Sequence, residues 1–389
     1  MRLNRVWHLM AASKSFMSGV AVTHLCFLVS SANAQSAFQF RPSFSLTQMH
    51  DSNLFSTPAN VREDFITRLT PTVDSDYRST RLRLAGHYSL DAEAFAEHTD
   101  LTNALARQQA SLTAGYDPTT RLSFMTGAEY LTTQTPGELN ADTSLSFTRA
   151  RASRFGAHSQ LTRKLSAVSS MTAGYTFTQD RLASQFESKT HTAHLGIERR
   201  RSSRAAIRFS YRFRGFSFAS NGLDGSPVDS HALSVGWTRA LARQISVRLD
   251  GGPRVTNGEI RPELNTSVEA HFRAVDWSLG YGRTQNTVIG VVGTADVQHV
   301  AAGAVWRIGR SLQMHVAPAY FRNALNDRAA DVYTVRIGVE RSITRMLSLD
   351  VAVDASRQVG HLVPVMAGDR IDRSGISIRF VTGPTAREE

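Results

Sequence analysis

Cysteine is almost absent from this sequence: Cys26 is the only one among 389 residues. With a single thiol the chain forms no internal disulfide and no metal site built from several thiolates. Residues 23–25, Thr-His-Leu, also lack the small residue that a lipid-attachment site places before its cysteine. Because Cys26 lies in a segment that we expect to be removed, we predict a mature chain without cysteine chemistry.

Long apolar runs are missing as well. No stretch after the N-terminus is apolar for 18 residues, so the sequence predicts no membrane-spanning helix. An exported chain can still cross a bilayer as a β-barrel, in which only every second residue needs to be apolar.

Catalytic and cofactor-binding motifs are the third absence. The sequence has no Gly-x-Ser-x-Gly, no His-Glu-x-x-His and no phosphate-binding glycine loop. Serine is so abundant that a Ser–His pair, as in outer-membrane lipid hydrolases, arises easily by chance. A lone histidine on a polar strand face is far more often a wall residue, so we predict no enzyme, no cofactor and no metal. The histidines considered for such a pair are His158, His191, His194 and His315.

The segment Asp51-Ser52-Asn53 is the one candidate for a calcium loop. Calcium takes six to eight oxygen ligands, and two side chains do not supply them. Asp, Ser and Asn are also typical turn residues, so we interpret the segment as a turn.

Residues 1–34 are typical of a secretory signal. Arg2, Arg5 and Lys14 give a cationic start, residues 16–29 are mostly apolar, and Ala32-Asn33-Ala34 is a small-x-small cleavage site. The apolar part is shorter than the roughly 20 residues of a membrane span. We therefore predict export, with cleavage near Ala34.

Positive charge is carried almost entirely by arginine, because lysine occurs only at Lys14, Lys164 and Lys189. Removal of the signal leaves 41 basic and 33 acidic residues, a net charge of +8. These charges are spread singly along the chain instead of forming one patch, and the chain is exported, so we predict no nucleic-acid partner. A genomic bias toward arginine is an alternative reason for the scarcity of lysine.

What the sequence does contain is alternation of apolar and polar residues, the period of a β-strand. Leu82, Leu84 and Tyr88, for example, share one face of an expected strand. About 18 such strands (16 to 18) follow one another without a break in composition. We predict an all-β fold, a transmembrane antiparallel up-and-down β-barrel over residues 35–380, with a short C-terminal tail at 381–389. A soluble β-sandwich needs two domains, and a β-helix needs a short repeat that the sequence lacks.

The expected connections alternate between short and long. Residues 74–76 and 199–202 are short links, whereas 92–103, 178–188, 215–229 and 321–330 are long ones. Outer-membrane barrels have short turns and both chain ends on the periplasmic side and long loops outside. We therefore predict this orientation.

The polar faces of the expected strands carry many charged residues of both signs. Burying them without water costs several kcal/mol per unpaired ion, so the polar face is expected to line a wet lumen and the apolar face to contact lipid. An excess of arginine favours anionic solutes, whereas pairing between arginines and acids merely braces the wall; the two interpretations are compatible. The predicted pore-lining residues are Arg81, Arg83, Arg208, Arg212, Arg214, Arg248 and Arg254.

Residues 373–380 resemble the closing strand of bacterial outer-membrane β-barrels. The assembly signal of that strand reads polar, any, Gly, any, any, hydrophobic, any, aromatic, and Arg373, Gly375, Ile378 and Phe380 fill these places. The resemblance implies insertion among outer-membrane lipid by the barrel-assembly machinery. In most such proteins the aromatic residue is the last one, whereas residues 381–389 follow it here.

The chain also resembles the β-barrel porin 2 family near its start. Residues 48–55 (Gln-Met-His-Asp-Ser-Asn-Leu-Phe), 64–66 and 69–71 match the Asp-Ser-Asn-hydrophobic loop after strand one and the following strand that ends in hydrophobic-x-Pro. The similarity covers residues 38–75 as a motif and the remainder only as a pattern. Members are outer-membrane barrels of Gram-negative bacteria, often linked by gene surroundings to exopolysaccharide production, which the resemblance implies for this chain.

Three functions are compatible with these patterns. The first is a porin-like channel for passive conduction or export of an anionic solute or exopolysaccharide. The second is a non-conducting structural barrel that acts through extracellular loops such as 215–229, and the third and least favoured is a lipid hydrolase. Sequence alone does not distinguish a loop folded into the lumen from any other loop.

Overall fold

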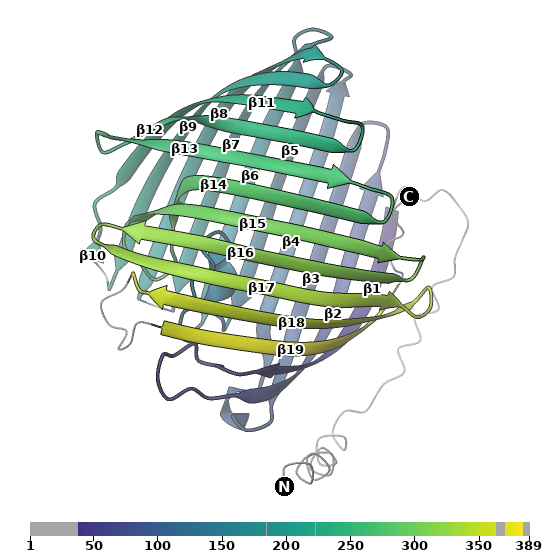
Figure 1. Ribbon diagram of the computed structural model, residues 1–389, viewed down its shortest axis with the longest axis vertical. Coiled ribbons are helices and arrows are strands. Elements are labelled where there is room, and N and C mark those ends of the chain that lie inside the picture. The colour runs from purple at the N-terminus through teal and green to yellow at the C-terminus, as the bar shows by residue number, and fades with distance from the viewer. Residues whose placement is uncertain (1–37, 184, 222, 363–369, 384–389) are drawn as a thin grey trace. The chain divides into compact units, whose positions relative to one another are not determined.

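The chain forms a closed antiparallel β-barrel, seen from the side in the computed structural model of Figure 1. The structure describes residues 38–183, 185–221, 223–362 and 370–383, so the expected signal and most of the expected tail lie outside the described residues. Each long strand pairs with the next, and β1 closes the ring by pairing with β19. Eighteen long strands form the ring, which confirms the predicted fold and strand number.

The strands have the following bounds: β1 Phe38–Asp51, β2 Asp64–Arg78, β3 Leu82–Phe95, β4 Asn103–Thr119, β5 Leu122–Thr133, β6 Ala152–Lys164, β7 Ser169–Leu182, β8 Phe186–Ser202, β9 Ala205–Ser220, β11 Val228–Ala240, β12 Ile245–Thr256, β13 Glu259–His271, β14 Val275–Thr287, β15 Thr294–Ile308, β16 Leu312–Leu325, β17 Arg328–Ser342, β18 Leu347–Gly360 and β19 Arg370–Thr382. The two-residue β10, Leu223–Asp224, pairs only with the end of β9. Short 3-10 helices lie at Thr99–Leu101 (η2) and Pro136–Asn140 (η3). Among the described residues, no helix has the length and apolar content needed to cross a membrane.

The two ends of the barrel differ in their connections. Eight turns of two to four residues lie at the end where β1 begins and β19 ends, which we call the turn end. The nine connections at the opposite, loop end range from two residues to the 18 residues of 134–151. The expected alternation is therefore only partly correct, because 183–185, 257–258 and 326–327 at the loop end are as short as the turns.

Several expected links are strand instead. β2 continues through residues 74–76 to Arg78, because Asp74 and Asp76 accept bonds from His87 and Arg41 inside the barrel and so fit a strand with a polar inner face. At the loop end, β7, β8, β16 and β17 extend into the expected loops 178–188 and 321–330. The outward residues of these extensions, such as Gln179 and Arg322, are polar, and apolar ones such as Phe186 and Phe321 face the clusters inside the barrel, so the outward apolar row by which strands are recognised is missing.

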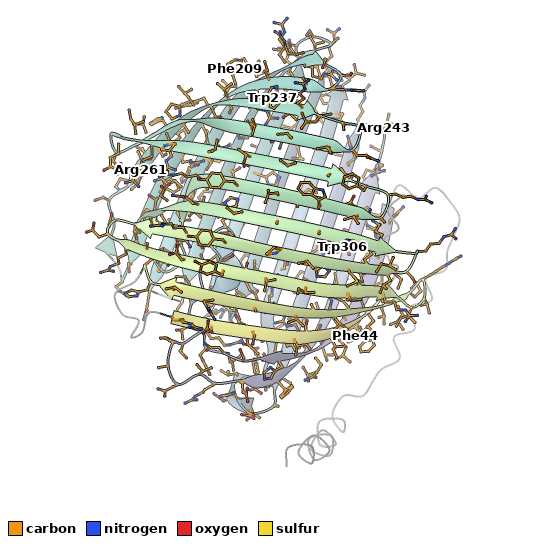
Figure 2. The ribbon with its side chains drawn as sticks, in the orientation of Figure 1. Phe44, Phe209, Trp237, Arg243, Arg261 and Trp306 are labelled. Atoms are coloured by element: carbon orange, nitrogen blue, oxygen red, sulfur yellow. The ribbon has the colours of Figure 1, made fainter. Side chains whose placement is uncertain are left out.

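The outer wall carries the apolar residues and the inner wall the charges. Phe44, Phe209, Trp237 and Trp306 lie on the outer wall in Figure 2, and rows such as Leu195 and Ile197, or Ile376 and Ile378, are exposed there. Buried apolar residues instead gather at the loop end in three clusters. The barrel is thus apolar outside and charged inside, and its three buried apolar clusters, in the part of the chain that the structure describes, lie where loops meet the wall.

Candidate functional site

The inner wall is braced by ion pairs between residues that face each other across one strand boundary. Arg68 on β2 pairs with Glu93 on β3 at 2.6 Å, and Arg379 on β19 pairs with Asp350 on β18 at 2.8 Å. Because the partners are in register, these charges neutralise each other and cross-link neighbouring strands. Further pairs of this kind are Arg154–Asp180 and Arg208–Glu198.

Of the arginines predicted to line the pore, Arg81 and Arg83 lie at the turn end. Arg81 is in the turn between β2 and β3, and Arg83 pairs with Asp117 at 2.6 Å. Arg248 is exposed on the inner face of β12, whereas the next residue, Leu249, points outward. These three residues lie apart from the loops that narrow the barrel.

Arg212 and Arg214 on β9 come together at one carboxylate. Both bond Glu263, at 2.7 and 2.6 Å, across β11 and β12. Arg208, on the same face, is held by Glu198. This part of the wall therefore has one more positive charge at Glu263 than that carboxylate balances.

Arg254 lies between two hairpins and has only 2% of its surface exposed. The β13–β14 pairing stops at Leu264 and Arg283, while the β12–β13 and β14–β15 pairings continue. Arg254 bonds Asp296 at 3.0 Å across this gap, and Arg283 bonds the same carboxylate at 2.7 Å. Arg254 thus ties the tips of the two hairpins together.

The loop 134–151 folds into the barrel and reaches the opposite wall. It leaves β5 and returns to β6, yet Arg149 bonds Glu93 of β3 at 3.2 Å. The Nδ2 of Asn323 on β16 donates to the carbonyl of Thr143 at 3.0 Å, and the backbone N–H of Ser146 donates to Gln358 of β18. Contacts with walls on both sides are possible only for a loop that crosses the lumen, and we call it the inner loop.

The β14–β15 connection, residues 288–293, joins the inner loop inside the barrel. The N–H of Ile289 donates to Asn140 Oδ1 at 3.1 Å, and Val288 and Ile289 are almost fully buried. Apolar side chains of the two loops pack against inward residues of the wall at the loop end. One cluster contains Leu145, Val288, Val291, Ala295, Val297, Ala330, Val332 and Leu362, and the other contains Leu139, Ala152, Phe186, Phe216, Phe218 and Ile289.

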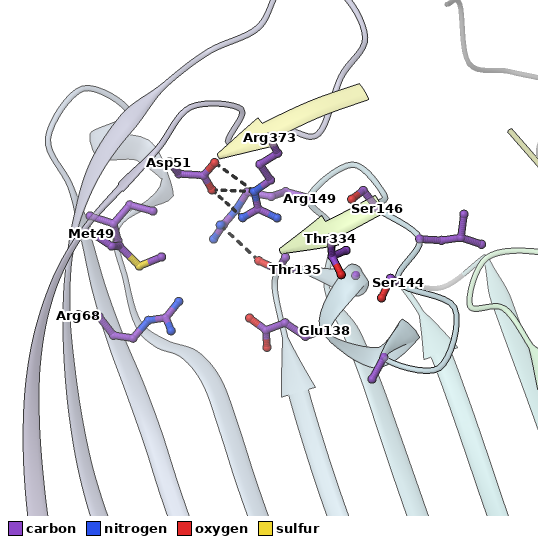
Figure 3. Close-up of a pocket in the computed structure, with 14 residues that line it drawn as sticks. Met49, Asp51, Arg68, Thr135, Glu138, Ser144, Ser146, Arg149, Thr334 and Arg373 are labelled. Carbon is purple, nitrogen blue, oxygen red and sulfur yellow. Dashed lines mark hydrogen bonds and ion pairs between the residues drawn. The ribbon is translucent and has the colours of Figure 1, made fainter. Parts of the chain in front are cut away.

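Two adjoining cavities lie inside the barrel, one between the inner loop and the wall and one along the wall, and they share four residues: Met49, Asp51, Arg68 and Arg373. The first, about 330 Å³, lies against the inner loop, and Figure 3 shows its charged side chains from loop and wall facing one space. The second, about 190 Å³, continues along β17, β18 and β19. Together they are lined by five arginines and four acids: Arg68, Arg149, Arg336, Arg373 and Arg379, with Asp51, Glu138, Asp350 and Asp354.

The segment Asp51-Ser52-Asn53 closes the ring beside these cavities. Buried Asp51 accepts three bonds from the Arg373 guanidinium, the shortest 2.6 Å. The N–H of Ser52 donates to the Ser374 carbonyl at 2.9 Å, and the Asn53 amide donates to the Asp372 carbonyl at 3.0 Å. The motif is therefore a seam clamp between the first and last strands, as well as the turn that we predicted.

Sequence reasoning missed the residues that narrow the lumen. Arg68 and Glu93 could have been found, because they lie on inward faces of alternating strands. Arg149 and Glu138 could not, because no local pattern shows that their loop turns inward. None of the seven arginines predicted to line the pore borders either cavity.

The histidines considered for catalysis are wall residues. His158, His194 and His315 each lie over a glycine of the neighbouring strand, and His191 is bonded to Tyr175 on the outer surface. Over the described part of the chain, no group of three or more His, Cys, Asp or Glu side chains could hold a metal ion.

No protein-family model matches the sequence, and no curated protein matches it. The resemblance to the β-barrel porin 2 family therefore stays a prediction. Among solved structures the chain is similar to OpdQ of Pseudomonas aeruginosa, with 11% identity, a TM-score of 0.46 and coverage of 88% of this chain and 98% of that one. It is also similar to P. aeruginosa OccK2 (OpdF) in complex with glucuronate, with 9% identity, a TM-score of 0.48 and coverage of 89% and 98%. Similarity at these values carries no argument about the solute.

Proposed function

We propose that the chain is a porin-like barrel of the bacterial outer membrane that passes small anionic solutes through the space between the inner loop and the wall of β17, β18, β19, β1 and β2. The observation that carries this proposal is the arginine-rich pair of cavities beside the inner loop, in a barrel that is apolar outside. Arginine binds carboxylate and phosphate groups in a bidentate manner. Glu93 pairs with Arg68 and Arg149, so the arginine that we propose to meet the solute is Arg336, which is exposed in the second cavity.

The size of the cavities bears on the solute. The two cavities, of about 330 and 190 Å³, each suit a single small molecule. An exopolysaccharide chain, which the family resemblance implies as cargo, is too long to lie within either cavity. Small anions are therefore the substrate class that this conformation favours.

Single-channel recording in planar bilayers tests the proposal. Arg336 is exposed in the lumen and lines the second cavity, so Arg336→Glu should shift the reversal potential in a salt gradient toward cation selectivity. Arg261→Glu, the same change on an exposed hairpin tip at the loop end, is the matched control and should leave it unchanged. An identical reversal potential in wild type and Arg336→Glu contradicts an anion path at this wall.

A second candidate is a non-conducting structural barrel, favoured by the two apolar clusters that pack the loops against the inner wall at the loop end. It predicts negligible current in the wild type and a large current after deletion of residues 136–148. Current in the wild type supports the channel and counts against the closed barrel.

The closing strand supports assembly in the outer membrane. Ile378 and Phe380 point outward and are exposed, whereas Arg373 and Gly375 face inward. β19 continues two residues beyond Phe380, to Thr382. We propose that the barrel-assembly machinery binds this strand through its outward residues before Arg373 meets Asp51 and the ring closes.

A further inference from the structure

Seven of the eight turns at the turn end contain an arginine, and none of the eight contains Asp or Glu. All eight lie within the described residues, and the turn without an arginine, residues 165–168, directly follows Lys164. The connections at the loop end, by contrast, contain acids such as Glu63, Glu97 and Asp142. Positive charge is therefore concentrated at one end of the barrel. The other seven turns each contain one arginine: Arg81, Arg121, Arg204, Arg243, Arg273, Arg310 and Arg345.

Four further arginines extend this charge onto the outer wall. Each follows an apolar outward row and ends it near the turn end: Arg239, for example, follows Val235 and Trp237 on β11. Their cross-strand neighbours on the outer surface are apolar except for Ser169 opposite Arg199, as Arg341 shows between Leu312 and Leu349. These arginines therefore face the surroundings of the barrel and not its lumen. The four are Arg163, Arg199, Arg239 and Arg341, all exposed.

Aromatic and apolar residues mark the same level as a bilayer interface. The three tryptophans after residue 37, at 237, 277 and 306, all lie within three residues of a strand terminus at the turn end. Tryptophan is enriched at head-group depth on both sides of membranes. Exposed Leu241 and Met346 within the turns carry the apolar surface up to this level. Figure 2 shows Arg243 at this end of the barrel and Arg261 at the other.

We propose that these eleven arginines form a collar that binds the phosphate groups of anionic phospholipids in the leaflet on the turn side. The proposal rests on the membrane location proposed above. The guanidinium group of arginine forms bidentate hydrogen bonds with phosphate oxygens, and its long side chain reaches from an apolar wall to the lipid head groups. A leaflet rich in anionic phospholipid would thereby hold the barrel at a fixed depth and orientation.

The tryptophans provide a built-in probe for the test. The purified full-length barrel is inserted into phosphatidylcholine vesicles that contain a small fraction of brominated phosphatidylglycerol or of brominated phosphatidylcholine, and quenching of tryptophan fluorescence is compared. We expect the quenching to show a roughly fivefold preference for phosphatidylglycerol over phosphatidylcholine at these sites. A preference of this size corresponds to the attraction between one arginine and an anionic lipid surface. The collar variant, Arg163, Arg199, Arg239 and Arg341→Gln, should lose this preference.

A matched variant controls for net charge. Arg62, Arg181, Arg261 and Arg370→Gln removes four exposed arginines from the loop end and should keep the preference. Equal quenching by both lipids in the inserted wild type overturns the collar, as does loss of the preference in both variants. If soluble polygalacturonate binds the wild type but not the collar variant while no lipid preference exists, the collar serves a polyanion instead. Absence of quenching by either lipid means that the barrel did not insert, which contradicts the membrane location itself.

Discussion

Asp51 and Arg373 form an ion pair across the seam at which β1 and β19 close the ring. Asp51 is 3% exposed and accepts three bonds from Arg373, which belongs to the opposite end of the sequence. Arg373→Ala leaves a buried carboxylate without its cation, and we expect a loss of about 3–5 kcal/mol in the free energy of unfolding. The measurement is the urea midpoint of the change in electrophoretic mobility between folded and unfolded protein.

Arg357→Ala is the control for this prediction. Arg357 pairs with Asp372, the residue before Arg373, but both side chains are about half exposed. Exposed ion pairs contribute little to stability, so its urea midpoint should stay close to wild type. Equal midpoints for both variants would show that the seam does not depend on the buried pair.

The sequence could suggest the turn at Asp51-Ser52-Asn53 but not its role as a clamp. Turn propensity is a local property of three residues, whereas the partners of the clamp, residues 372–374, lie more than 300 positions later. The assembly signal likewise predicted Arg373 as a polar position of the closing strand without indicating its partner. The role of these residues as a clamp depends on the pairing of β1 with β19, and that pairing follows from closure of the ring.

At the scale of single strands, Gly252 marks an irregular site. The β11–β12 register passes from Ala232 opposite Arg254 to Val235 opposite Gly251, so two residues on each strand fall outside it. A Cβ on Gly252 would meet the carbonyl group of Leu233, with the carbonyl carbon at 2.9 Å. Because backbone atoms cannot move aside as a flexible side chain does, Gly252→Ala should cost about 1–3 kcal/mol in the free energy of unfolding.

Gly280→Ala on β14 provides the comparison for Gly252. Its Cβ would meet nothing closer than the Thr266 carbonyl oxygen at 3.7 Å, so the change should be neutral or slightly stabilising. Urea midpoints in the same detergent measure both. A Gly252→Ala barrel as stable as Gly280→Ala would contradict the close approach of β11.

The inner loop is held by its apolar side chains, which gives a prediction about current. Leu145 is 2% exposed in the cluster with Val288 and Val332. Leu145→Asp places a carboxylate in a dry cluster, which should release the loop and raise single-channel conductance severalfold. Leu241→Asp, the same change in an exposed turn, should leave conductance unaltered. Unchanged conductance in Leu145→Asp would mean that this cluster does not limit the passage.

Strands were predictable from the sequence wherever one face belongs to the apolar outer wall. The apolar rows of β9, β17 and β19 show the two-residue period plainly, and these strands were located correctly. Where β2, β7 and β16 extend beyond that surface, their outward residues are largely polar, and the sequence therefore predicts loops at these ends. The inner loop was beyond reach for a related reason: its apolar residues are spaced to suit partners on distant strands.

For the molecule as a whole, the decisive feature is that apolar side chains face outward and charged ones inward. Adjacent residues on β4 separate this arrangement from a soluble barrel. Leu112 is 58% exposed on the outer face, and Thr113 is exposed on the inner face.

If the exterior is lipid, Leu112→Arg should cost about 2–4 kcal/mol on folding into vesicles, the penalty for arginine near the bilayer midplane. Thr113→Arg places the arginine in a wet lumen and should cost little. In a soluble barrel both exposed positions would accept arginine equally. The folded fraction on gels run without heating, compared for the two variants after folding into phosphatidylcholine vesicles, therefore measures directly which solvent each face of the wall meets.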